Sequence, residues 1–158
     1  MKTAVLLLTA AAILVADQVT KALVVNNVAL GQRVSVLGDL LQVWHAQNRG
    51  ASFSLFQGGG LIFVVVSILA MGMVAYFHRT MIGRSWWMHL MLGAILGGTL
   101  GNLTDRVRQG YVVDWASVGI GDLRWPTFNV ADSSLVVGIG VLLVYLLLTD
   151  PGRRKAPA

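Results

Sequence analysis

The segment Leu61–Phe77, LIFVVVSILAMGMVAYF, contains 17 residues and no charged side chain. An α-helix rises about 1.5 Å per residue, so about 20 apolar residues are enough to cross the hydrocarbon core of a bilayer. Three more windows of this character run from about Thr3 to Val25, Trp86 to Leu103 and Phe128 to Leu148. The sequence therefore predicts four transmembrane helices in a single domain covering residues 1–158.

The composition agrees with a membrane protein. Of the 158 residues, 56% are hydrophobic and only 12% are charged, which lies outside the usual range of soluble domains. The first residues, MKTAVLLLTAAAILVADQ, also resemble a signal peptide, with Lys2 as its basic region and Ala16 before a cleavage point. We favour a retained span, because apolar residues resume after Lys21 and an even number of spans fits the distribution of charge.

The basic residues predict the orientation in the membrane. Four spans place both termini on one side, together with the loop between the second and third spans. That side has one acid, Asp150, and six basic residues: Lys2, Arg79, Arg84, Arg153, Arg154 and Lys155. Cytoplasmic loops carry an excess of lysine and arginine, so this side is expected to be cytoplasmic. The net charge of +5 then reflects topology and gives no reason to expect nucleic acid as a partner.

The two loops on the opposite side, about 26–60 and 104–127, are expected to form β-structure. In RVSVLGDLLQVWHAQ (Arg33–Gln47), hydrophobic residues alternate with polar ones around a Gly38-Asp39 turn, which predicts a β-hairpin at the membrane surface. Glycines and Pro126 punctuate the second loop, which can add one or two strands. The predicted fold class is an all-α polytopic membrane protein with a small extracytoplasmic β-structure.

The third apolar window carries small residues on a helical spacing. Gly93, Gly97 and Gly101 recur every four residues, which would let the backbone of a neighbouring helix approach closely. Asn102 follows at the outer end of this window. Its amide could form an interhelical hydrogen bond or contact a substrate, and the sequence leaves both open.

All seven acidic residues are aspartates, and six of them lie on the outer side. Asp17 and Lys21 are four residues apart on one helix, so an ion pair is expected. Asp105 lies near the C-terminal end of its helix, where the dipole disfavours an anion, so it should need a cationic partner. The remaining structural or solvated aspartates are expected to be Asp39, Asp122 and Asp150.

This sorting leaves Asp114 and Asp132. The apolar neighbours of Asp114 in YVVDW should raise its pKa, whereas Asp132 lies in the first turn of a helix, where the ionised form is favoured. Such an asymmetric pair suits a general acid and a general base. Each of the two aspartates also has a simpler explanation. Asp132 could pair with Asn129 in a capping box. Asp114 could bind an arginine, with Arg106, Arg108 and Arg124 as the candidates.

Other catalytic groups fit poorly. His45, His78 and His89 are too far apart to form a metal-ligand motif, and cysteine is absent, so we expect no metal and no cofactor. GASF (Gly50–Phe53) is similar to the serine motif of rhomboid proteases, but no histidine is placed to activate Ser52.

Five motifs together resemble lipoprotein signal peptidase, the bacterial type II signal peptidase family. They span most of the chain in one order: DQVTK (Asp17–Lys21), NRGASF (Asn48–Phe53), GNLTDR (Gly101–Arg106), YVVDW (Tyr111–Trp115) and FNVAD (Phe128–Asp132). The family usually has alanine where this chain has Ser52, a change that concerns only the packing of that loop.

The resemblance implies an aspartic endopeptidase that removes signal peptides from prolipoproteins, cutting before a cysteine that carries diacylglycerol. It implies that Asp114 and Asp132 form the catalytic dyad. By the same motifs, Asn48, Asn102, Arg106 and Asn129 would line the substrate groove. Structural support would come from Asp17, Lys21, Gly50 and Asp105. The family fold implies four helices and a β platform on the outer surface of the bacterial cytoplasmic membrane, and the resemblance implies membrane lipid and prolipoprotein as partners. We expect the protein to work as a monomer.

Two other functions are compatible with the composition. An ion- or proton-coupled transporter could use Asp17 as a coupling group, although no two halves of the chain look related and no acid lies near the predicted bilayer centre. A binding protein without catalytic activity would keep the fold and hold precursors without cutting them.

Overall fold

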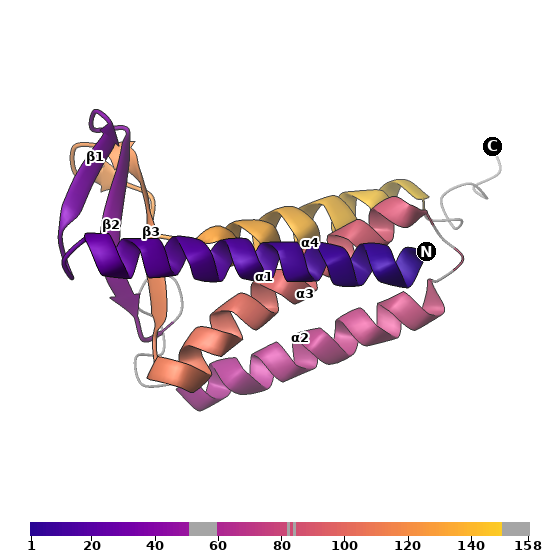
Figure 1. The fold of residues 1–158 in the computed structure, drawn as a ribbon. Helices are drawn as coiled ribbons and strands as arrows, with labels where there is room; N and C mark the ends of the chain where they lie inside the picture. The colour runs from indigo at the N-terminus through magenta and orange to yellow at the C-terminus, as the bar shows by residue number, and fades with distance from the viewer. Residues whose placement is uncertain (51–59, 82, 84, 150–158) are drawn as a thin grey trace.

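The computed structural model describes residues 1–50, 60–81, 83 and 85–149. Within these ranges the chain forms four helices and one small sheet region (Figure 1). The elements in chain order are α1 (Lys2–Asn27), β1 (Arg33–Leu37), β2 (Leu41–Asn48), α2 (Gly60–Thr80), α3 (Trp86–Gln109), β3 (Val112–Ile120), β4 (Leu123–Arg124) and α4 (Val130–Thr149).

The helices form a bundle, and the sheet lies across one end of it (Figure 1). α3 packs against each of the other three helices and is the most buried of the four. The N-terminus and the last turn of α4 lie at the end opposite to the sheet. There an apolar core fills the space between the helices, formed by Leu6, Val74, Met88, Leu92, Ile95 and Leu142.

The small residues of α3 allow close helix packing, as predicted. A Cβ atom on Gly93 would lie 2.5 Å from the carbonyl oxygen of Leu6, and one on Gly97 would lie 2.7 Å from that of Ala10. A neighbouring face of α3 packs as tightly against α4, where a Cβ atom on Gly98 would lie 2.5 Å from the carbonyl oxygen of Ala131. α1 and α4 therefore approach α3 through backbone atoms.

The predicted hairpin is confirmed as β1 and β2, which pair antiparallel around the turn at Gly38. The second loop contributes β3 and β4, and the strand order is β1-β2-β3-β4. β3 starts soon after Gly110, whose left-handed backbone (φ 78°) ends α3. This short connection places the sheet directly against the polar end of the bundle.

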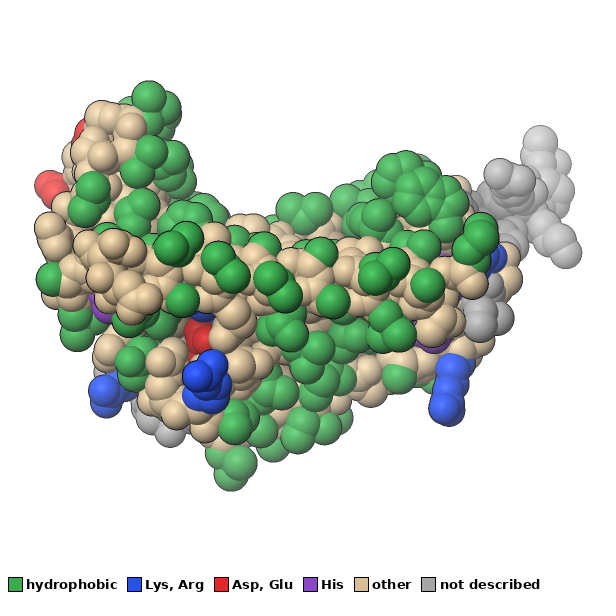
Figure 2. All heavy atoms as spheres, in the orientation of Figure 1, with side chains coloured by type: hydrophobic (Ala, Val, Ile, Leu, Met, Phe, Trp, Pro, Cys, Tyr) green, Lys and Arg blue, Asp and Glu red, His purple; other side chains and the backbone are tan. Residues whose placement is uncertain are grey.

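Three of the described helices are long and apolar enough to cross a membrane: Lys2–Asn27, Leu61–Thr80 and Val130–Leu148. α3 is not among them, and its last turns carry Asp105, Arg106 and Arg108. On the visible face, hydrophobic side chains cover the bundle and the acidic ones lie at the sheet end (Figure 2).

Candidate functional site

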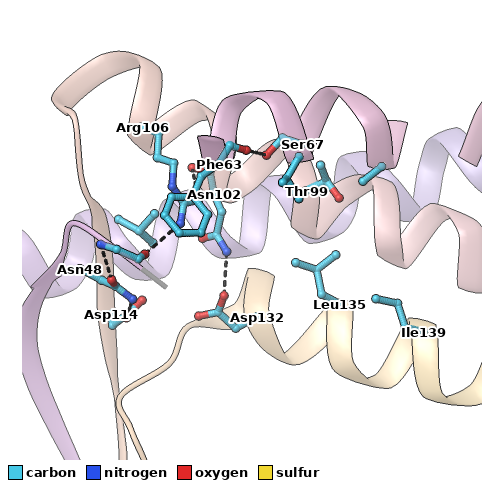
Figure 3. A pocket seen from close by; sticks show the side chains of 14 residues that line it. Asn48, Phe63, Ser67, Thr99, Asn102, Arg106, Asp114, Asp132, Leu135 and Ile139 are labelled. Carbon is cyan, nitrogen blue, oxygen red and sulfur yellow. Dashed lines mark hydrogen bonds between the residues drawn. The ribbon is translucent and has the colours of Figure 1, made fainter. Parts of the chain in front are cut away.

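Asp114 and Asp132 line the same cavity, although 17 residues of sequence separate them. Asp114 belongs to β3 and Asp132 to the first turn of α4. The cavity has a volume of about 340 Å³, and Figure 3 shows both carboxylates at one end of it. The structure thus brings together the two residues that the sequence singled out.

Asp114 is almost completely buried, with 2% of its surface exposed. Its Oδ2 accepts a hydrogen bond from Asn48 Nδ2 at 2.9 Å, and its Oδ1 accepts one from Asn129 Nδ2 at 2.9 Å. Burial, and after it the negative charge of Asp132, raise the pKa of Asp114 from 3.8 to about 7, against the opposing effect of the amides. Asp114 is thus a carboxyl group able to hold a proton near neutral pH.

Asp132 and Asn129 form the capping box considered above. The backbone N–H of Asp132 donates to Asn129 Oδ1 at 2.9 Å, and the backbone N–H of Asn129 donates to Asp132 Oδ2 at 3.1 Å. The other oxygen of Asp132, Oδ1, accepts a hydrogen bond from Asn102 Nδ2 at 2.7 Å. Capping and placement in the cavity are therefore compatible, because they use different oxygens of one carboxylate.

The direction of each amide in this network follows from groups that can only donate. Gly50 N–H donates to Asn48 Oδ1 at 3.0 Å, so the Nδ2 of Asn48 must face Asp114. The backbone N–H of Asp132 orients Asn129 in the same way. Both aspartates therefore receive N–H groups from the protein, an arrangement that favours carboxylate acceptors.

A buried ion cluster lies behind the dyad. Lys21 Nζ lies 2.7 Å from Asp17 Oδ2 and 2.8 Å from Asp105 Oδ2. The expected pairing of Asp17 with Lys21 is confirmed, and so is the need of Asp105 for a cation. Asp17 Oδ1 accepts the backbone N–H of Ala131 at 3.0 Å, which ties α1 to the first turn of α4.

Gln18 belongs to this cluster, and the sequence did not single it out. Its Nε2 lies 3.2 Å from Asp17 Oδ2, 3.0 Å from Asp105 Oδ1 and 3.3 Å from the carbonyl oxygen of Gly101. A second cavity, of about 400 Å³, is lined by Gln18, Lys21, Asp105 and Arg108 among others. The cluster therefore lies between two hollows, and the dyad faces only the first of them.

The first cavity is polar at the dyad and apolar along the helices. Arg106 lines it, with Cζ 4.7 Å from the centre of the Phe63 ring and hydrogen bonds of 3.3 and 3.5 Å to the carbonyl oxygens of Asn102 and Gly50. Farther from the dyad, the lining passes to the apolar side chains of Leu135 and Ile139 on α4 (Figure 3). Val66 and Ala70 of α2 also line the cavity. The arrangement can accommodate a chain that is polar at one point and apolar beyond it.

The expected groove residues separate into two groups. Asn48, Asn102 and Arg106 line the cavity with the dyad, and Gly50, which was expected to give structural support, lines it as well. Asn129 is not among the lining residues; it is 1% exposed and holds the dyad from behind. Asn102 forms the interhelical hydrogen bonds that were one of its two alternatives, while its contact with a substrate stays a prediction.

Two other expectations concern the sheet and the metal. Asp39 and Asp122 lie in turns, as predicted, and Asp39 also contacts Arg124 across the sheet at 3.1 Å. No group of three histidine or acidic side chains near enough to share a metal ion occurs in the described part of the chain. Ser52, Phe53 and Asp150 lie outside the described residues.

Comparisons with known proteins agree with the motifs. The sequence model of the family described as signal peptidase (SPase) II matches residues 9–148. The chain is 39% identical over 144 residues to the lipoprotein signal peptidase of Bacillus velezensis, covering 90% of this chain and 93% of that protein. It is 36% identical over 135 residues to the lipoprotein signal peptidase of Halothermothrix orenii, covering 85% and 89%.

Solved structures show the same architecture. A bacterial membrane enzyme determined by the in meso method at 2.3 Å resolution superposes with a TM-score of 0.83 at 29% identity, covering 97% of this chain and 93% of that one. A second, at 1.9 Å, gives a TM-score of 0.80 at 30% identity, covering 92% and 93%. Together with the apolar helices, these matches make the protein a multi-pass membrane protein, and the chain belongs to the lipoprotein signal peptidase (signal peptidase II) family.

Proposed function

We propose that this protein is an aspartic endopeptidase that removes signal peptides from prolipoproteins, cutting before a cysteine modified with diacylglycerol. Family membership supports a protease that acts on prolipoproteins. The observation that carries the aspartic mechanism is the shared cavity of Asp114 and Asp132, two carboxylates delivered by different elements to one polar end. The cavity lining includes neither cysteine nor histidine among the described residues, so the carboxylates are its candidates for proton transfer.

In the proposed reaction, one water molecule lies between the two carboxyl groups, which share one proton. Asp132 accepts a proton from the water as the water oxygen attacks the scissile carbonyl carbon, and Asp114 donates its proton to the carbonyl oxygen. When the C–N bond breaks, the nitrogen takes the proton held by Asp132. Asp114 regains its proton from a hydroxyl group of the intermediate, and no covalent enzyme intermediate forms.

The other polar groups hold the peptide and the dyad. Asn48, Asn102 and Arg106 line the cavity and can hydrogen-bond to the substrate backbone near the scissile bond. Arg106 also supplies a positive charge near the oxygen on which negative charge develops, and such preorganised groups stabilise a transition state. Asn129 acts from behind by orienting both carboxylates.

The membrane arrangement follows from the same geometry. We propose four spans in one domain, with α3 crossing inside the ring of more apolar helices. The sheet would lie on the extracytoplasmic surface of the bacterial cytoplasmic membrane and the termini in the cytoplasm, because Lys2 and Arg79 lie in elements at the opposite end from the sheet. The apolar part of the cavity between α2 and α4 would admit the signal helix and acyl chains from the lipid. The protein would work as a monomer.

The experiment compares three Asp→Asn variants of the purified protein on a diacylglyceryl-modified precursor and its unmodified form, with mass spectrometry to locate the cut. Asp114→Asn and Asp132→Asn should each lose at least a factor of about 10² in rate. Asp122→Asn is the matched control, because Asp122 lies exposed in the turn between β3 and β4. Wild-type cleavage by either dyad variant would remove that residue from the mechanism, and equal cleavage of the unmodified precursor would contradict the lipid requirement.

A further inference from the structure

Lys21 has three acceptors around one buried ammonium group. Its Nζ lies 2.7 Å from Asp17 Oδ2, 2.8 Å from Asp105 Oδ2 and 3.0 Å from Asn102 Oδ1, and the residue is 3% exposed. An ammonium group has three N–H donors and no acceptor. Each donor therefore has a partner, and the oxygen end of the Asn102 side chain must face Lys21.

This contact determines what Asn102 offers to Asp132. With its Oδ1 facing the lysine, Asn102 directs Nδ2 at Asp132 Oδ1, at 2.7 Å. Asp132 Oδ2 faces the backbone N–H of Asn129 at 3.1 Å. Both oxygens of Asp132 thus face donors that cannot turn into acceptors, which suits a carboxylate and leaves no protein acceptor for a protonated oxygen.

Both oxygens of Asp114 also face amide donors, so these hydrogen bonds alone do not distinguish the two carboxyl groups, and the difference lies in the groups that orient the amides. The amides that donate to it, from Asn48 and Asn129, are oriented by neutral backbone N–H groups. The series of hydrogen bonds that ends at Asp132 begins at the positively charged ammonium group of Lys21. The charge of Lys21 acts on both carboxyl groups, and burial has the larger effect on each of them; what differs is the hydrogen-bonded relay through Asn102, which ends at Asp132.

We infer that Lys21 is a positioning residue of the dyad: acting through Asn102, it keeps Asp132 ionised as the base and leaves the shared proton on Asp114. This inference rests on the proposed function of the two aspartates. It gives Lys21 an effect on the chemistry beyond the structural support predicted from the sequence.

The charges around Asp132 come from several elements. Lys21 on α1 and Arg106 on α3 are the cations whose charges act on it. The carboxylates of Asp17 on α1 and Asp114 on β3 add negative charge there, and Asp105 on α3 faces Lys21. α2 contributes no titratable side chain to the described lining of the cavity. Loss of the lysine would leave the opposing carboxylates in excess, so Asp132 would ionise only at higher pH.

The test needs variants that separate this effect from loss of the ion cluster. Lys21→Met alone would leave two buried carboxylates without a cation and endanger folding. The double variant Lys21→Met/Asp105→Asn keeps the formal charge of the Lys21, Asp17 and Asp105 cluster at its wild-type value. Asp105→Asn alone is the matched reference, since it makes the same change at residue 105 and retains Lys21.

The measurement is the pH profile of cleavage of the lipid-modified precursor, with thermal unfolding in detergent as the folding control. Compared with Asp105→Asn, the double variant should show its acid limb displaced to higher pH by about one unit, the size of effect that one nearby charge produces. Lys21→Gln/Asp105→Asn should show a smaller displacement, because glutamine can still donate to Asn102 but carries no charge. If Lys21→Met/Asp105→Asn does not fold, Lys21→Gln/Asp105→Asn can be compared with Asp105→Asn in its place.

An acid limb at the same pH in the folded lysine variants and in Asp105→Asn would overturn the inference and leave Lys21 a structural role. That result is distinguishable from failure of the proposed function. If the proposed function fails, Asp114→Asn or Asp132→Asn still cleaves the precursor. If only the inference about Lys21 fails, both of these variants are inactive, and the acid limb of the lysine variants lies at the same pH as that of Asp105→Asn.

Discussion

The side-chain amide of Asn129 donates to Asp114 Oδ1 at 2.9 Å, and this hydrogen bond connects the start of α4 to the middle of the sheet. Asn129 also precedes the first residue of α4, where its Oδ1 accepts the backbone N–H of Asp132 at 2.9 Å. One side chain therefore contacts both members of the dyad. A helix cap, normally a local feature, here determines where the two carboxylates lie with respect to each other.

Replacing Asn129 should separate these two roles. Serine is a good helix cap but lacks an amide that could reach Asp114, whereas alanine provides neither function. We expect Asn129→Ser to keep the helix cap but lose at least about tenfold in cleavage rate, a factor worth about 1.4 kcal/mol in transition-state stabilisation. Asn129→Ala should show the same loss of rate and be about 1 kcal/mol less stable than Asn129→Ser, because it lacks the cap as well.

Cleavage assays and thermal unfolding of the two variants in detergent provide the measurements. If Asn129→Ser cleaved at the wild-type rate, Asn129 would be a helix cap without influence on the dyad.

Hydropathy predicted the existence of the four helices better than their ends. α3 continues to Gln109, beyond the expected end near Leu103, because its polar residues point inward as well as outward. Asp105 is only 5% exposed, and Lys21 of α1 neutralises it. Hydropathy averaged over a window of sequence counts a buried and paired aspartate as the end of an apolar segment, since the average contains no information about a partner on another helix.

The sequence also located the dyad but missed part of its surroundings. Asp114 and Asp132 could be identified because their local environments differ, one apolar and one at a helix start. Asp105 was expected to need a cation, but the sequence could not identify which one, because its partner Lys21 lies on another helix. Gln18 was missed because an uncharged amide in an apolar span carries no signal until its three acceptors are seen together.

The contact between α1 and α3 should depend on the absence of a side chain at Gly97. A Cβ atom there would lie 2.7 Å from the carbonyl oxygen of Ala10 and 2.9 Å from Cβ of Ile13. We expect Gly97→Ala to destabilise the protein by about 1–3 kcal/mol, the usual range for overpacking. Gly140→Ala is the control, because a Cβ atom on Gly140 of α4 has no neighbour within 4 Å. Equal melting temperatures of the two variants would contradict close packing at Gly97.

Phe63 should position Arg106 over the cavity. The guanidinium carbon lies 4.7 Å from the ring centre, within the range of a cation–π interaction. Phe63→Leu removes the aromatic face and should weaken cleavage by about 0.5–1 kcal/mol, which corresponds to a few-fold change in kcat/KM. Phe63→Tyr keeps the face and should retain activity. If both variants behaved alike, the position of Arg106 would depend on its hydrogen bonds to Asn102 and Gly50 alone.

The buried carboxyl group of Asp114 should make stability depend on pH in a predictable direction. Burial first, and then the charge of Asp132, raise the pKa of Asp114 from 3.8 to about 7. Between about pH 4 and pH 7 the unfolded chain releases this proton while the folded protein retains it, so the folded state loses stability as the pH rises through this window. A shift of about three units corresponds to about 4 kcal/mol.

Asp114→Asn has no ionisable group at residue 114, so its folded state should not lose stability in this way as the pH rises. Its melting temperature in detergent, compared with that of the wild type, should therefore rise progressively from about pH 4 to pH 7 and level off above. Asp122→Asn removes an exposed carboxylate of the same kind and should follow the wild type at every pH. A constant difference between Asp114→Asn and the wild type across this range would mean that Asp114 ionises in the folded protein as it does in water, and the assignment of the shared proton to Asp114 would then fail.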